Sequence, residues 1–153
     1  MEDIFKYFWV LLFLTVLLNG IILNAKSKKY IEQNPTLEAG YKGYIKKFML
    51  FGSIPCLLIG FGNESGLTNS VFDYLIPNIS NPIVILFHLM IVVYWVMRMR
   101  WIYFKEGAEF LEAHSGLLRD PNVTAKKIKL LTPLPIIGWF VMIILMWGNI
   151  FPV

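Results

Sequence analysis

The sequence predicts an all-α polytopic membrane protein with four transmembrane helices and helical cytoplasmic extensions. Hydrophobic residues make up 57% of the 153-residue chain and charged residues only 16%, a balance that is too apolar for a soluble domain. Four apolar runs approach the ~20 residues that a helix needs to cross a bilayer. Thirteen of the 14 Lys and Arg fall in two segments, Lys26–Lys47 and Arg98–Lys129. We expect one membrane domain over residues 1–153, with spans at about 7–25, 44–61, 83–104 and 132–149.

The first span, 7–25, is apolar except for one deeply placed amide. Tyr7, Phe8 and Trp9 stand at its outer end, where amphipathic aromatic rings favour the headgroup level. Asn19 lies inside the span, and hydrocarbon offers its side chain no hydrogen bond. We therefore expect a hydrogen bond to another helix, with contact to a substrate as the alternative.

The second span, 44–61, is predicted to begin as a cytoplasmic helix. Asn34-Pro35 is typical of an N-cap followed by proline at the first helical position. Within the span, small residues repeat every four positions at Gly52, Cys56 and Gly60. Such a stripe lets a second helix approach closely, so we expect it to face a helix of the same protomer or of a homo-oligomer.

The third span, 83–104, ends in a basic and aromatic segment. Tyr94 and Trp101, at i−4 and i+3, are placed to stack on the guanidinium of Arg98. Three lysines return to the same end of the protein just before the fourth span. Four basic residues are predicted to contact an anionic lipid headgroup or a similar phosphate: Arg98, Arg100, Lys126 and Lys127. The alternative is that they serve only as topological anchors.

Beyond the third span the pattern becomes amphipathic. Phe104, Gly107, Ala108 and Leu111 are spaced for one helical face, so the span is expected to continue without a break into a charged helix. The segment 107–111, followed by His114-x-Gly116, resembles a stretch in small uncharacterised bacterial four-span inner-membrane proteins. This resemblance implies a similar four-span arrangement over most of the chain and supplies no activity.

A second set of polar residues is a candidate site: Asn19, His88, Glu109 and His114. No other titratable residue is expected at the same membrane depth as His88. The simpler interpretation is therefore a histidine that only packs in the protein interior, and the alternative is a proton relay. Glu109 and His114 lack the helical spacing of metal ligands, and the single Cys56 has no partner for a disulfide. The sequence therefore predicts no metal and no cofactor.

Two further elements complete the chain. A short helix on the membrane surface is expected at Val71–Ile76, between polar and proline residues. The fourth span is expected to start at Thr132-Pro133, with Trp147 as its outer anchor.

The charge distribution predicts an orientation and narrows the function. By the positive-inside rule, the two basic segments face the cytoplasm and both termini lie outside the cytoplasm. The resemblance to bacterial four-span proteins implies a bacterial inner membrane. The basic residues sort by loop, so the excess charge does not indicate a nucleic acid partner. We expect a binding or structural subunit of a membrane assembly. Its expected partners are the lipid bilayer, anionic lipid headgroups, and a second copy of the chain or another membrane protein. The alternatives are a small transporter or channel component, and a membrane-interface enzyme that acts on an anionic lipid with Glu109 or His114 as acid or base.

The orientation can be tested by cysteine labelling of intact cells. Positions Lys28, Lys46, Arg119 and Lys127 are expected on the cytoplasmic side, and Asn63, Asp73 and Val153 on the other. Cysteine at position 73 should react with a reagent that does not cross the membrane, while cysteine at 28 or 127 should stay unlabelled. Labelling at 28 or 127 would reverse the orientation.

Overall fold

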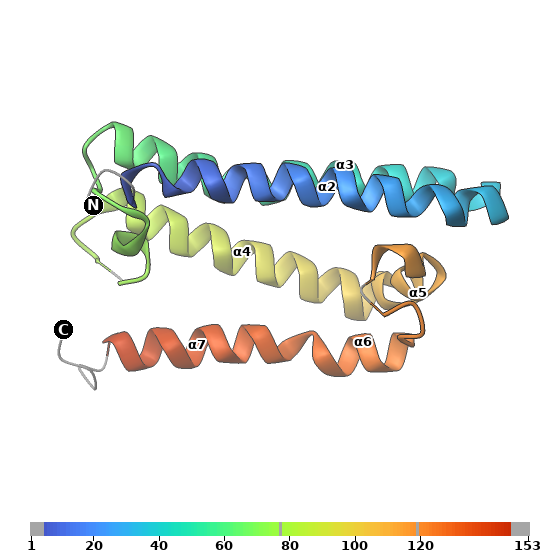
Figure 1. Ribbon diagram of the computed structural model, residues 1–153. Helices are drawn as coiled ribbons and strands as arrows, with labels where there is room; N and C mark the ends of the chain where they lie inside the picture. Colours follow the sequence, from blue (N-terminus) through green and yellow to red (C-terminus); the bar gives the residue numbers. More distant parts are fainter. Residues whose placement is uncertain (1–4, 77, 119, 148–153) are drawn as a thin grey trace.

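The computed structural model describes residues 5–76, 78–118 and 120–147, and these residues form helices joined by short turns (Figure 1). Four helical segments are long and apolar enough to cross a membrane, which confirms the all-α fold with four candidate spans. They are Phe8–Gln33, Pro35–Glu64, Pro82–Phe104 and Ala125–Leu145. Arg119, Val153 and the predicted end of the fourth span at 148–149 lie outside the described residues, as does the side chain of the predicted anchor Trp147.

The first two spans form a long helical hairpin. Helix α2 (Phe8–Gln33) turns at Asn34 into the short 3-10 helix η1 (Pro35–Leu37) and then into α3 (Glu38–Glu64). The Asn34 side chain accepts a hydrogen bond from the backbone N–H of Thr36 at 3.2 Å. The predicted cap and helix restart are confirmed, and both helices extend well beyond the apolar part of their spans.

The small-residue stripe on α3 faces α2, as predicted. A Cβ added at Gly52 would lie 2.9 Å from Val16 Cγ1, and one added at Gly60 would lie 2.7 Å from the Trp9 ring. Cys56, between them, is buried. Trp9 therefore turns inward to α3 and does not act only as an interfacial anchor. The two helices approach closely because Gly52 and Gly60 have no side chain, so Val16 and Trp9 pack directly on the α3 backbone.

The end of α3 that carries Asn63 is tied down by buried polar groups. The Asn63 amide donates to the carbonyl of Lys6 at 2.8 Å and accepts from the Thr68 hydroxyl at 2.7 Å. The predicted surface helix is the 3-10 helix η2 (Val71–Tyr74), but it does not simply lie on a surface. Its Tyr74 is 1% exposed and inserts into a cluster with Ile59, Ile83 and Val84.

The third span does not continue into the next helix, so the prediction of an unbroken helix was wrong. Helix α4 (Pro82–Phe104) ends at Lys105, and α5 (Gly107–Ala113) starts after Glu106. Glu106 has φ +54°, a left-handed conformation that costs a residue with a Cβ about 1–2 kcal/mol. This conformation turns α5 away from the axis of α4.

The break at Glu106 has a packing reason. Ala108 and Leu111 are buried in a cluster with Ile102, which belongs to the preceding helix, and a straight helix would not let them touch it. A Cβ on Gly107 would lie 2.5 Å from the Trp101 ring, so only glycine permits this close return. Phe104 was expected on the same face but is 80% exposed, because the break separates it from the rest.

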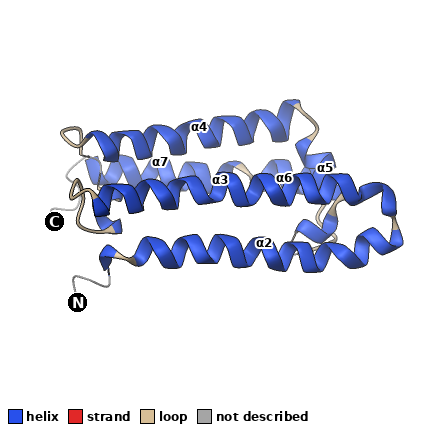
Figure 2. Ribbon diagram, turned by 90° about the horizontal axis from the view of Figure 1, so that it is seen from above, coloured by secondary structure: helices blue, strands red, loops and turns tan. Residues whose placement is uncertain are grey.

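The four spans follow one another in space in chain order. After η3 (Ser115–Leu117), α6 (Ala125–Leu131) leads into α7 (Pro133–Trp147), which starts at the predicted proline. Figure 1 shows α4 between the α2–α3 pair and α7, and Figure 2 shows α2 and α4 on opposite sides. Helices α2 and α3 pack closely along their length, whereas α7 makes few contacts with the other spans.

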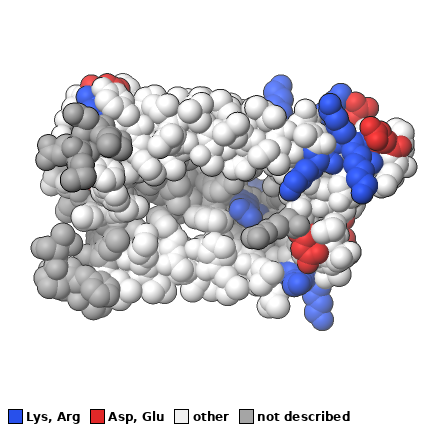
Figure 3. Space-filling model, in the orientation of Figure 1, with Lys and Arg blue, Asp and Glu red and all other residues white. Residues whose placement is uncertain are grey.

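Charged residues gather at one end of the molecule, which we call the basic end (Figure 3). It comprises the last turns of α2, the start of α3, the end of α4 and the segment 105–131, and it holds every Lys and Arg of the described residues except Lys6. Lys6 lies at the opposite end and forms an ion pair of 3.8 Å with Glu64. The folded chain thus keeps the charge asymmetry that the sequence shows along its length.

The α2–α3 contact leads to a stability prediction with an internal control. Gly52→Leu and Gly60→Leu should each lower the free energy of unfolding in detergent by about 1–3 kcal/mol, because the new side chain must displace Val16 or Trp9. Gly43→Leu, on the same helix, should be tolerated, since nothing lies within 4 Å of a Cβ added there. Thermal denaturation is the measurement, and equal melting of all three variants would show that the stripe is not a packing surface.

Candidate functional site

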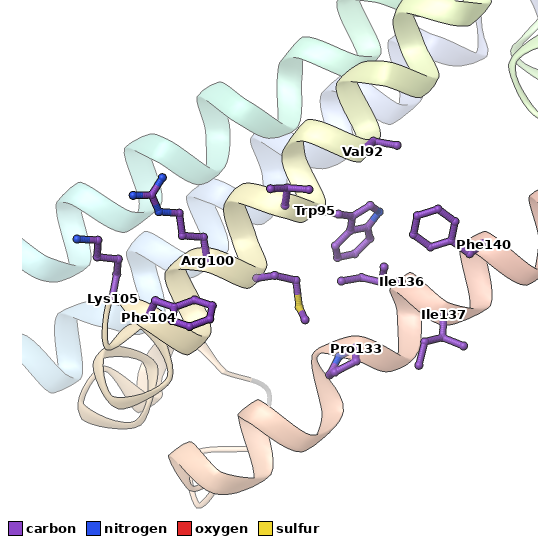
Figure 4. A pocket seen from close by; sticks show the side chains of 11 residues that line it. Val92, Trp95, Arg100, Phe104, Lys105, Pro133, Ile136, Ile137 and Phe140 are labelled. Carbon is purple, nitrogen blue, oxygen red and sulfur yellow. The ribbon is translucent and has the colours of Figure 1, made fainter.

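An open groove of about 940 Å³ lies between α4 and α7 (Figure 4). Its walls are apolar and come from one face of each helix. On α4 they are Val92, Trp95, Val96 and Met99, and on α7 they are Pro133, Ile136, Ile137 and Phe140. Both sets follow the i, i+3, i+4, i+7 spacing of a helix-packing seam, yet the two helices stay apart and leave a slot between them.

The end of the groove at the basic end carries two cations. Arg100 and Lys105 line it together with Phe104, and no acidic residue is among its lining residues. Both cations are exposed, and neither forms an ion pair with a described residue. The groove is therefore an apolar slot with a positively charged mouth, a combination that suits a ligand with an apolar tail and an anionic head.

A smaller cavity of about 250 Å³ adjoins the groove on the side away from the basic end. Val92 lines both cavities, so they follow the same face of α4. His88 lies here, with its ring centroid 6.1 Å from that of Trp139. Both ring nitrogens of His88 are buried and lack a hydrogen-bond partner among the described residues.

The basic residues that were predicted to form one site lie on different surfaces of the fold. Arg98 lies about 200° around α4 from Arg100, at 100° per residue, and does not line the groove. Its guanidinium lies 5.5 Å from the ring centroid of Trp95, which replaces the predicted stacking on Tyr94 and Trp101. Trp101 instead packs against Tyr44 and Phe110.

Lys126 and Lys127 are exposed on α6, at the basic end but outside the groove. Of the four predicted contacts, only Arg100 lines the cavity. Lys105, which completes the mouth, was missed because the expected continuous helix would have carried it away from the membrane. The helical spacing of the apolar residues on α4 could have indicated the apolar wall of the groove. The sequence carried no indication that α7 stands apart from α4.

The predicted polar residues do not come together. Asn19 is exposed on α2, and His88 lies in the small cavity between α4 and α7. Glu109 forms an ion pair with Lys129, and this hydrogen bond lowers the pKa of the Glu109 carboxyl. The carboxylate is therefore ionised and engaged at neutral pH. Within the described residues, no group of three His, Cys, Asp or Glu is placed to hold a metal ion.

His114 is a buried packing residue at the basic end. It is buried against Phe110, with ring centroids 4.0 Å apart, and edge-on to Tyr41 at 4.9 Å. Its Nδ1 lies 2.8 Å from the carbonyl oxygen of Phe110, which can only accept, so Nδ1 carries the proton. Gly116 donates its N–H to the Tyr41 hydroxyl at 3.2 Å. These contacts dock α5 and η3 on the hairpin and account physically for the Gly107 to Gly116 motif.

Gly40 and Gly43 offer a matched test of this docking. A Cβ on Gly40 would collide with the His114 imidazole, whereas one on Gly43 meets nothing within 4 Å. Gly40→Ala should lower the melting temperature, and Gly43→Ala should raise it through the ~1 kcal/mol advantage of alanine in a helix. If Gly40→Ala stabilises the protein as much as Gly43→Ala does, His114 is not packed against α3.

No family model, curated protein or solved structure matches this chain. The resemblance of the Gly107 to Gly116 stretch to bacterial four-span proteins therefore stays a prediction.

Proposed function

We propose that this chain is a four-span protein of the bacterial inner membrane, and that it binds an anionic lipid in the groove between α4 and α7. In this proposal it acts as a binding or structural subunit of a membrane assembly, with its basic end in the cytoplasm. The observation that carries the proposal is the groove itself, whose apolar walls lead to Arg100 and Lys105 at one mouth.

The length of the groove fits one lipid leaflet. From Val92 to Lys105 the helix rises about 20 Å at 1.5 Å per residue, compared with about 15 Å for half of the hydrocarbon core. An acyl chain lying along Val96 and Phe140 would cover apolar surface that α4 and α7 do not cover for each other. Its headgroup would then stand at the level of the two cations.

The charges favour an anionic headgroup over a zwitterionic one. Each basic side chain near a membrane surface adds about 1 kcal/mol of attraction to anionic lipid, and salt reduces it over a Debye length of ~8 Å. Arg100 and Lys105 place this attraction at one end of the groove, while Lys126 and Lys127 add to the general positive potential of the same end. Arg100 supplies a planar fork of donors that suits phosphate oxygens.

A transporter is the second candidate, and the shared lining of the two cavities favours it. Together the groove and the smaller cavity follow α4 from Lys105 to Ile85, which is most of the helix. A lipid or another amphiphile could move along this face. Movement of fluorescent anionic lipid between leaflets of proteoliposomes would distinguish transport from static binding. The enzyme hypothesis has less support, because Glu109 and His114 lie outside the groove and are engaged in other contacts.

The binding proposal is tested by native mass spectrometry of the purified full chain with phosphatidylglycerol and phosphatidylcholine. The double variant Arg100→Gln, Lys105→Gln should retain phosphatidylglycerol several-fold less, with little change for phosphatidylcholine. Val96→Trp, which fills the slot without changing charge, should reduce retention of both lipids.

Arg98→Gln is the matched control. It removes one positive charge from the same helix end at a residue that does not line the groove, so its retention should stay close to that of the unchanged protein. If Arg98→Gln lowers retention as much as the double variant, general positive potential explains the binding. If no variant differs from the unchanged protein, the groove does not bind lipid.

A further inference from the structure

Helix α2 presents the amide of Asn19 on its exposed surface, next to the apolar Leu18. Asn19 is exposed, and its side chain makes no hydrogen bond within the described residues. At 1.5 Å per residue it lies about 16 Å from Phe8 and about 10 Å from Lys26. Those two residues are about as far apart as the hydrocarbon core is thick, so Asn19 lies well inside it.

An amide at this depth needs a partner. Hydrocarbon cannot replace the hydrogen bonds that the side chain loses on leaving water, and each unsatisfied group costs several kcal/mol. No described residue of the protomer supplies the partner, because α2 turns Trp9, Val16 and Gly20 to α3 and leaves Asn19 outside. The exposed Thr15, one turn away, is already bonded to its own helix through the carbonyl of Leu11 at 2.7 Å.

We propose that the partner is a second copy of this chain, packed α2 against α2 with Asn19 of each copy bonded to Asn19 of the other. Any partner must carry a hydrogen-bonding group at the same depth. A two-fold axis parallel to the helices places the same residue there automatically. An amide has both a donor and an acceptor, so two of them form a reciprocal pair.

The residues around Asn19 are suited to such a contact. Leu11, Leu18 and Ile22 are each about half exposed and lie on the same side of α2, where they would pack against their counterparts. Lys26, two turns beyond Asn19, is also exposed and would repel its counterpart. The contact is therefore confined to the apolar half of the helix, with the amide pair near its inner edge.

The test measures self-association of the full chain in phosphatidylcholine vesicles. Energy transfer between donor-labelled and acceptor-labelled protein is followed over a series of protein-to-lipid ratios. Asn19→Leu should raise the dissociation constant about tenfold, the factor that an interhelical hydrogen bond of about 1.4 kcal/mol supplies. Asn19→Gln keeps the amide and should retain the dimer.

Asn24→Leu is the matched control. Asn24 is another exposed asparagine on α2, about 140° around the helix from Asn19, so its replacement should leave association unchanged. The proposal is overturned if the unchanged protein is monomeric at every ratio, if Asn19→Leu dimerises as well as the unchanged protein, or if association requires a different membrane protein. The lipid-binding groove plays no part in the readout, so either proposal can fail without the other.

Discussion

The close contact between α2 and α3 positions most of the other features. Lipid is as apolar as leucine, so helices in a membrane gain little by burying apolar surface and are held by short-range packing. Gly52 and Gly60 make that packing possible by letting Val16 and Trp9 approach the backbone. The register set there brings Tyr30 and Tyr41 side by side at the basic end, with ring centroids 6.2 Å apart.

Tyr30 and Tyr41 form the surface on which the segment after α4 packs. Gly116 packs against the Tyr30 ring and donates to the Tyr41 hydroxyl, so α5 and η3 dock on the hairpin. At the opposite end, Asn63 accepts a hydrogen bond from Thr68 and Tyr74 donates one to α3, and these contacts fasten the loop that leads into α4. Helix α4 is therefore held at both ends by α3. Among the described residues, helix α7 makes no comparable attachment, and the groove separates it from α4.

The sequence predicted what depends on local chemistry. Span positions follow from apolar runs, the turn at Asn34-Pro35 from cap preferences, and the α3 stripe from its spacing. The break at Glu106 could not be predicted in this way. The residues after it fit a helical period, and the gain that reverses the chain comes from contact with Ile102, which only tertiary packing reveals.

The candidate site was predicted only in part for the same reason. Arg98 and Arg100 are two residues apart, so their opposite directions follow from helical geometry alone. Which of the two meets a cavity depends on where α7 lies, and no sequence pattern fixes that position. Asn19 illustrates a different limit. Its position inside the first span showed that its side chain needs a hydrogen-bond partner, but the sequence did not show that Asn19 is exposed on the outer surface of α2.

The weak attachment of α7 has a consequence for the order in which the molecule is built. The chain is synthesised from its N-terminus at about 5–20 residues per second, so the tightly packed hairpin is complete before α7 exists. During that interval, the α4 face that becomes one wall of the groove is in contact with whatever surrounds the unfinished protein. In a bilayer this is lipid. Under the lipid-binding proposal, the last helix would then close over molecules already in place, and the groove would acquire its first occupant during assembly and not by later entry.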